Sequence, residues 1–282
     1  MSNSRSFLRK ILAVVWSGLL AFFILVIGQG VWGALLIGNL KTSPTIPWCA
    51  PAMAIVLWLF WQYLGGNGWP HSTSEVRHRY LRANRVPGPV LTWAVVAGVL
   101  SIISLAGLWI VLFQLVKMPP NVIDDFSKYP KLTAALVVVT ASLVSPLTEE
   151  AAFRGYCQSI LEREFAGTPA ILISTVFFTA AHLVHGLFWP KLLVYFLVGI
   201  VFGVTAYLTK SVLPALPGHI IGDMAFFVLV WPHDAARRLV WDTGADTWFW
   251  IHVAQAAVFA GLAILAFFKL SNVSKEVCEQ VE

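Results

Sequence analysis

The sequence has little charge and few cysteines, and each shortage excludes a class of protein. Charged residues make up 12% of the 282 residues, whereas a soluble domain carries about a quarter, so too little polar surface remains for a protein dissolved in water. The three cysteines, Cys49, Cys157 and Cys278, are odd in number and lack CxxC spacing, which argues against a disulfide framework. HExxH and GxSxG are also absent, so an ordinary zincin helix is excluded.

Apolar residues are abundant instead, at 58% of the chain. A run of about 20 apolar residues can cross the ~30 Å hydrocarbon core of a bilayer as a helix. The connections between such runs are short and polar. We therefore predict an all-α polytopic transmembrane bundle in which residues 1–282 form a single integral membrane domain. About eight spans are expected, near residues 11–38, 48–65, 89–115, 133–161, 168–187, 191–209, 212–231 and 247–268.

The basic residues predict the orientation of the chain and its surroundings. The net charge of +5 comes from a few loops rather than one basic face, which favours anionic membrane lipid over nucleic acid as a partner. Arg5, Arg9 and Lys10 precede the first span, and four arginines lie within residues 77–85, whereas only Lys41 separates the first two spans. Because basic loops stay inside, we expect cytoplasmic N- and C-termini in a bacterial plasma membrane.

Ionisable side chains inside spans are costly, so each one is a candidate for function. The fourth span carries Glu149, Glu150 and Arg154. Glu150 and Arg154 are four residues apart on one helix face, which predicts an ion pair. Adjacent helical residues are rotated by about 100°, so Glu149 points elsewhere and becomes the candidate for chemistry.

Two later spans carry histidines in a similar pattern. Phe178 and His182 share one helix face, and so do His219 and Asp223. From the helical rise, Glu149 and His182 lie about 21 Å from the expected cytoplasmic ends of their helices, and His219 about 14 Å. A site shared by the three motifs is therefore compatible with their depths.

A carboxylate with two histidines suits hydrolysis. A glutamate desolvated in a bundle can act as a general base towards water. The histidines can stabilise an oxyanion or pass a proton to the leaving amine. Glu149, His182 and His219 could instead hold Zn²⁺, since His₂Glu is a known catalytic ligand set. The residues alone leave both readings open, so no cofactor is certain and Zn²⁺ is the one candidate.

The three motifs together resemble a known family. EExxxR, FxxxH and HxxxN/D, in this order on separate spans, are similar to the CAAX-protease and bacteriocin-processing family (CPBP, also called Abi) of intramembrane endopeptidases. The resemblance covers residues 145–225, the expected catalytic core. It implies that Glu149 activates a water molecule and that His182 and His219 assist.

The resemblance also implies roles for the remaining motif residues. Glu150, Arg154 and Phe178 are expected to shape the site rather than react. Asp223 stands where many family members have asparagine, which usually helps to stabilise the oxyanion. An ionised aspartate would repel that charge, so Asp223 must be protonated or must orient His219.

The substrate and several alternatives remain open. The resemblance implies cleavage of a protein or peptide at the membrane, such as a prenylated CAAX tail, a leader peptide or a transmembrane end. A non-proteolytic member acting in bacteriocin self-immunity is one alternative, and a proton-coupled transporter is another. A b-type haem protein with His182 and His219 as ligands would leave Glu149 unexplained. His185 and His252 are expected to be packing or interfacial histidines.

Overall fold

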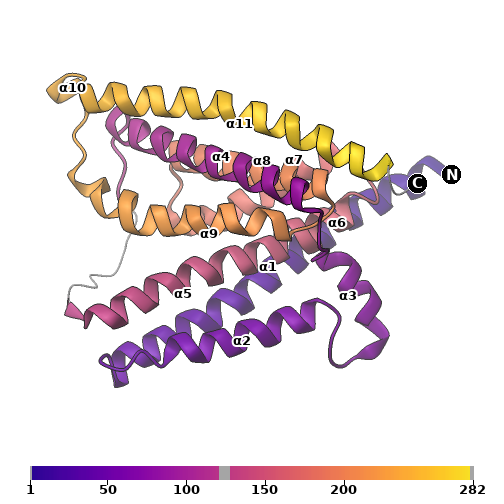
Figure 1. Ribbon diagram of the computed structural model, residues 1–282. Helices are drawn as coiled ribbons and strands as arrows, with labels where there is room; N and C mark the ends of the chain where they lie inside the picture. The colour runs from indigo at the N-terminus through magenta and orange to yellow at the C-terminus, as the bar shows by residue number, and fades with distance from the viewer. Residues whose placement is uncertain (1, 121–127, 280–282) are drawn as a thin grey trace. The chain divides into compact units, whose positions relative to one another are not determined.

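A computed structural model describes residues 2–120 and 128–279, and the regular elements in that part of the chain are all helices (Figure 1). Seven helical segments are long and apolar enough to cross a membrane, and α2 (Cys49–Leu64) is an eighth, shorter apolar helix. This confirms the predicted all-α polytopic bundle. The seven segments are Ser6–Thr42, Gly88–Leu115, Lys131–Leu161, Gly167–His185, Trp189–Thr209, Leu213–Ala236 and Thr247–Val277.

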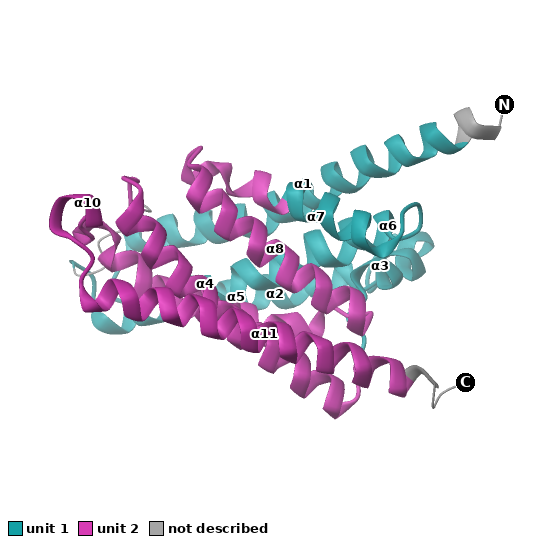
Figure 2. Cartoon of the chain, turned by 90° about the horizontal axis from the view of Figure 1, so that it is seen from above, with its two compact units in different colours: residues 1–84, 124–177 teal, residues 85–123, 178–282 magenta. Residues whose placement is uncertain are grey.

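The chain divides into two compact units, each made from two separate stretches of sequence (Figure 2). Unit 1 comprises residues 1–84 and 124–177, and unit 2 comprises residues 85–123 and 178–282. The third boundary between the units falls inside helix α7 (Gly167–Ala181). Glu149 therefore belongs to unit 1, whereas the histidines of the second and third motifs belong to unit 2. That residues 1–282 form a single membrane domain stays a prediction.

Unit 1 is built around three helices, α1 (Ser2–Thr42), α2 and α5 (Lys131–Glu149), which pack against one another. Apolar faces drive this packing, because hydrocarbon side chains fill the space between the helices. The short α3 (Ser74–Leu81) follows α2 and ends at Arg82, whose φ of 53° is left-handed. The buried cluster shared by the three long helices consists of Trp32, Cys49, Met53, Leu57, Val137 and Val144.

Unit 2 contains α4 (Gly88–Leu115), α8 (Trp189–Thr209), α9 (Leu216–Ala225) and α11 (Thr247–Glu279). Pro89 and Pro190 occupy the first turns of α4 and α8, where a proline costs no helical hydrogen bond. Helix α11 lies along α4, and both α8 and α9 also contact α4. Helix α4 is therefore the central helix of this unit, and the motif helix α9 packs on it.

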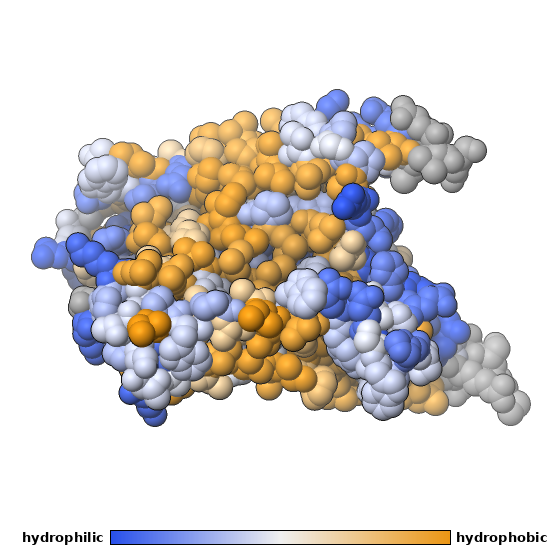
Figure 3. Space-filling model, turned by 60° about the horizontal axis from the view of Figure 1, so that its bottom comes forward, coloured by the Kyte–Doolittle hydropathy of each residue, from blue (hydrophilic) through white to orange (hydrophobic). Residues whose placement is uncertain are grey.

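Many large apolar side chains lie on the outside of the helices. In Figure 3 they cover the middle of the face that is drawn. Leu265 and Phe268 of α11 are 65% and 66% exposed, and Leu19 of α1 is 61% exposed. Water-soluble monomers rarely expose apolar patches of this kind. The chain is accordingly an integral membrane protein, while its membrane and its terminal orientation stay predictions.

Candidate active site

The first motif lies where a helix changes its geometry. Glu149 is the last residue of α5, and the next eight residues, the segment η3 (Glu150–Cys157), are π-helical before α6 (Gln158–Leu161) resumes the α-helix. Single π-turns within α-helices occur frequently at functional sites. The two glutamates therefore sit at the junction between the two geometries.

Side chains from other segments of unit 1 bind the backbone of η3. The hydroxyl of Ser174 donates to the carbonyl oxygen of Phe153 over 2.7 Å. The guanidinium of Arg82 donates to the carbonyl oxygen of Arg154, also over 2.7 Å, and to Glu162 over 2.8 Å. Burial lowers the pKa of the Arg82 guanidinium, and the charge of Glu162 opposes that shift. These bonds stabilise the irregular segment from two sides.

Glu149 is buried, at 4% exposure, and is held by two uncharged donors. Its Oε1 accepts hydrogen bonds from the Ser145 hydroxyl at 2.8 Å and from the Gln29 side-chain amide at 3.1 Å. Gln29 can reach from α1 because its neighbour is Gly28, where a Cβ would collide with the Thr148 side chain. Neither Gln29 nor Ser145 was predicted. The sequence feature that could have identified Gln29 is its polar amide side chain, which stands within an otherwise apolar first span.

Glu150 and Arg154 form the predicted ion pair. Arg154 Nη1 lies 3.7 Å from Glu150 Oε1, and the two side chains are 1% and 0% exposed. Removing one member of such a pair would leave a buried charge without its counter-charge, which is strongly destabilising. The pair therefore belongs to the structure of η3.

In unit 2, the aromatic ring of Phe178 connects the second motif with the third. Its centroid lies 4.5 Å from that of His182, as predicted, and 6.5 Å from that of His219. His182 Nδ1 lies 2.8 Å from the carbonyl oxygen of Phe178. We assign the proton to Nδ1, because only a donor can bind a carbonyl, so Nε2 is the acceptor in the neutral ring. Tyr195 of α8 stacks on His182 with centroids 4.2 Å apart.

His219 is buried between aromatic and acidic neighbours. Its ring is 4% exposed and stacks on Phe202 of α8, with centroids 4.6 Å apart. Its Nε2 lies 3.8 Å from Oδ1 of Asp223, which confirms that the two share a helix face. Asp223 is more open, with 23% of its side chain exposed. Phe202 and Tyr195 were not predicted, since no spacing rule joins them to the motif histidines.

A pair of glycines brings α9 close to α4 beside the third motif. A Cβ at Gly218 would lie 3.3 Å from Cα of Gly98, and one at Gly222 would lie 2.9 Å from the side chain of Ile102. Glycines spaced by four residues allow membrane helices to approach closely. Each glycine immediately precedes a motif residue, so this packing sets the direction in which His219 and its partner point.

The helical geometry changes at each of the three motifs. After Glu149 the helix becomes π-helical, and at His182 the chain enters the 3₁₀ segment η4 (His182–His185). Three residues after Asp223, α9 passes into the π-helical segment η6 (Phe226–Val230). Such departures from α-helical geometry often mark functional positions, so each motif is a candidate for function.

The described part of either unit offers no ready metal site. Among the described residues of either unit, no three His, Cys, Asp or Glu side chains form a group that could hold a metal ion. Unit 2 contributes His182 and His219, whereas Glu149 lies in unit 1. Dependence on Zn²⁺ through these three residues therefore stays a prediction.

The core of the chain matches a known family. Residues 131–225 match the family model described as type II CAAX prenyl endopeptidase Rce1-like. The match confirms the predicted family resemblance. No curated protein and no solved structure matches the chain. The Rce1-like region runs from the first residue of α5 to the last residue of α9 and contains all three motifs. At the level of the family, it supports a CAAX-type intramembrane protease that acts on a peptide substrate in a lipid environment.

His185 and His252, which belong to none of the three motifs, both have packing partners, as expected. His185 Nδ1 lies 2.8 Å from the Tyr195 hydroxyl, and His252 Nδ1 lies 3.0 Å from the Gln255 side-chain oxygen.

We expect His252→Ala to keep proteolytic activity within about twofold of the wild type, because surface or packing changes away from special features have small effects. A steady-state cleavage assay checks this, and an inactive His252→Ala protein that is still folded would show that the site has been misplaced.

Proposed function

We propose that this chain is an intramembrane endopeptidase that hydrolyses a peptide bond of a membrane-associated protein or peptide with a water molecule activated by Glu149. One observation carries the proposal. A buried carboxylate in the Rce1-like region is held in one orientation by uncharged donors, Ser145 and Gln29, beside a π-helical segment. Hydrogen bonds from these donors hold the carboxylate in one orientation, which suits a general base.

In the proposed reaction, Glu149 takes one proton from water while the water oxygen adds to the carbonyl carbon of the scissile bond. The carbonyl oxygen becomes an oxyanion, which preorganised donors stabilise. The carbon–nitrogen bond then breaks, and the proton held by Glu149 passes to the leaving amine. The products are a carboxylic acid, which then loses its proton to solvent, and a free amine, and Glu149 returns to its starting state.

His182 and His219 are proposed to assist this reaction. His219 supplies the donor to the oxyanion, and the nearby Asp223 keeps its ring in place rather than contacting the oxyanion itself. The 3.8 Å separation of His219 from Asp223 supports this division of roles. His182, with its Nδ1 engaged by the Phe178 carbonyl, presents Nε2 as an acceptor that takes the proton from Glu149 and passes it to the leaving amine.

Gln29 is a positioning residue in this account. Hydrogen bonds to charged groups contribute about 1.5–3 kcal/mol, so we expect Gln29→Leu to lower kcat by about 10- to 100-fold if the whole bond serves the transition state. KM should stay within about threefold, because Gln29 acts on Glu149 rather than on the substrate. Kinetics of the reconstituted protein measure both constants. The matched control is Gln62→Leu in α2, which should leave both unchanged. A Gln29→Leu protein with wild-type kcat would remove Gln29 from the mechanism.

The experiment that tests the proposed function uses the full chain in liposomes. Wild type and Glu149→Gln would each be incubated with membrane-associated peptides of three kinds, namely prenylated CAAX tails, leader peptides and transmembrane ends, and products identified by mass spectrometry. Cleavage by the wild type alone supports the proposal. Activity that is lost to a zinc chelator and restored by Zn²⁺ would indicate instead that Glu149, His182 and His219 bind the metal. If the wild type cleaves none of the three kinds, the non-proteolytic alternative is favoured.

A further inference from the structure

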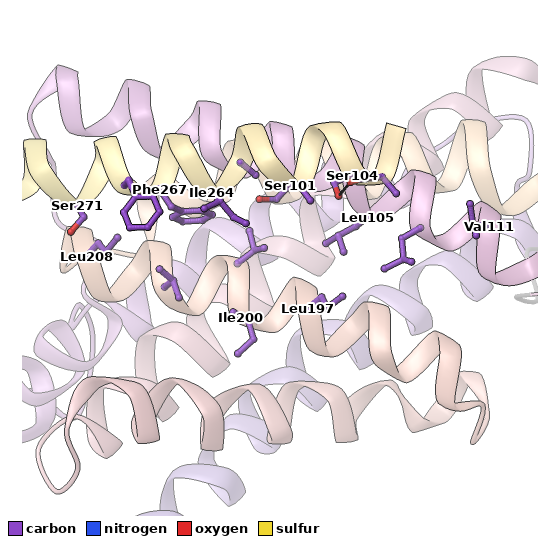
Figure 4. A pocket seen from close by; sticks show the side chains of 18 of the residues that line it. Ser101, Ser104, Leu105, Val111, Leu197, Ile200, Leu208, Ile264, Phe267 and Ser271 are labelled. Atoms are coloured by element: carbon purple, nitrogen blue, oxygen red, sulfur yellow. Dashed lines mark hydrogen bonds between the residues drawn. The ribbon is translucent and has the colours of Figure 1, made fainter. Parts of the chain in front are cut away.

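An apolar groove runs through unit 2, between α8 and α11 and over α4 (Figure 4). Its volume is about 840 Å³. All the side chains that line it are apolar except those of Ser101, Ser104 and Ser271. Branched and aromatic side chains from the three helices form most of its wall, among them Leu105, Ile200, Val204, Ile264 and Phe267.

The groove exists because α11 packs closely on α4 but not on α8. A Cβ at Gly107 of α4 would lie 3.0 Å from the backbone oxygen of His252 and 3.1 Å from the backbone nitrogen of Ala256, both in α11. The Ser104 hydroxyl also donates to the carbonyl oxygen of Ala256 over 2.8 Å. Where α11 faces α8, it carries small residues such as Ala260. Helices α8 and α11 therefore leave the groove between them.

The wall of the groove suits a hydrocarbon occupant. The hydroxyls of Ser101 and Ser104 donate to carbonyl oxygens of the protein itself, at 2.7 and 2.8 Å. Water needs two to four polar partners to be held in a cavity, and this wall offers hardly any. The three helices are all long enough and apolar enough to span a membrane, so the neighbouring solvent is lipid.

The length of the groove suits an extended chain. Its lining on α11 extends from Val253 to Ser271, which is about 27 Å at the helical rise. The groove is therefore long and follows the helix axis, as an extended hydrocarbon chain does.

One end of the groove is basic. Four exposed cationic residues, Arg85, Lys210, Lys269 and Lys275, lie within two residues of a single hydrophobic cluster. We call these four residues the basic mouth. Glu276 is the one carboxylate within residues 85–90, 205–213 and 267–277. The cluster includes two residues that also line the groove, Leu208 and Phe267, packed with Val86, Val90 and Val273.

We infer that this groove binds one acyl chain of an anionic phospholipid, whose phosphate lies at the basic mouth. Apolar area along the chain supplies affinity, and the cationic side chains select the charge of the headgroup. The inference goes beyond the proposed protease function and does not depend on it. The lipid would fill the space between α8 and α11 and so stabilise the unit that carries His182 and His219.

Native mass spectrometry of the full chain tests this inference. The protein would be purified in detergent containing equal amounts of phosphatidylglycerol and phosphatidylcholine with the same acyl chains, and the retained lipids counted. We expect the wild type to retain phosphatidylglycerol at least fivefold over phosphatidylcholine. Lys210→Gln with Lys269→Gln and Lys275→Gln should bring this ratio close to one. Ala260→Trp, which fills the groove, should abolish retention of both lipids.

Matched controls separate the groove from general effects. Lys41→Gln removes an exposed lysine from unit 1, and Ala254→Trp adds the same bulk to an exposed position of α11 outside the groove. Both should behave as the wild type. If Ala260→Trp fails to fold, Ala260→Leu should give a partial loss of retention. Equal retention of the two lipids by the wild type, or full retention by folded Ala260→Trp and Ala260→Leu proteins, would overturn the inference.

Discussion

Glu149→Gln is expected to lower kcat/KM by about 10²- to 10⁴-fold, the usual contribution of a general base. Glutamine has nearly the same shape and keeps an oxygen that can accept the hydrogen bonds from Ser145 and Gln29. It cannot take a proton from water. The protein should therefore fold and retain substrate while losing the chemical step. Steady-state kinetics and thermal unfolding of the same liposome preparation would measure the two effects separately.

Two other glutamates provide controls for this substitution. Glu75 pairs with Arg79 on the surface of α3, with 86% of its side chain exposed, so Glu75→Gln should leave activity unchanged. Glu150→Gln removes the buried partner of Arg154 and should mainly lower stability. Wild-type cleavage by Glu149→Gln would contradict the assignment of the base.

His219→Ala is expected to have the second largest effect, a loss of about 10²- to 10³-fold in kcat, as found when a donor to an oxyanion is removed. The buried ring stacks on Phe202, so alanine also removes packing. His219→Phe separates these contributions, because it keeps an aromatic ring for the stack but has no proton to donate. If catalysis needs the imidazole, both variants are inactive. A His219→Phe protein with substantial activity would reduce His219 to a packing residue.

Asp223→Asn tests the division of roles around His219. We expect a loss of about tenfold or less in kcat/KM, because a partly exposed carboxylate 3.8 Å from the ring that it orients contributes about 1 kcal/mol or less. The shape of the pH–rate profile should change with it, since the charge beside His219 has been removed. A purely structural role for Asp223 would leave that profile unchanged.

Local spacing was enough to predict some features of the site. The Glu150–Arg154 pair, the contact of Phe178 with His182 and the shared face of His219 and Asp223 all follow from helical geometry over four residues. The all-α membrane fold follows in the same way from apolar runs. Such patterns need no knowledge of which helices touch.

Other features depend on contacts between distant parts of the chain. Gln29 lies 120 residues before Glu149, and Phe202 reaches His219 from a different helix. The π-helical segments were not predictable either, because a local change of pitch leaves no mark in a hydrophobic pattern read at 3.6 residues per turn. The second expected span proved shorter than the others, since α2 has only 16 residues.

The measurement that tests the central claim most directly is a comparison of protein termini in membranes of cells that carry the wild type, the Glu149→Gln variant or neither. Quantitative mass spectrometry of N- and C-terminal peptides would detect every processing event. If the chain is a protease with Glu149 as its base, one or more processed termini appear with the wild type and disappear with Glu149→Gln, which also identifies the substrate. If Glu149→Gln produces the same termini as the wild type, or the wild type produces none while its loss still has a phenotype, the proposed function is contradicted.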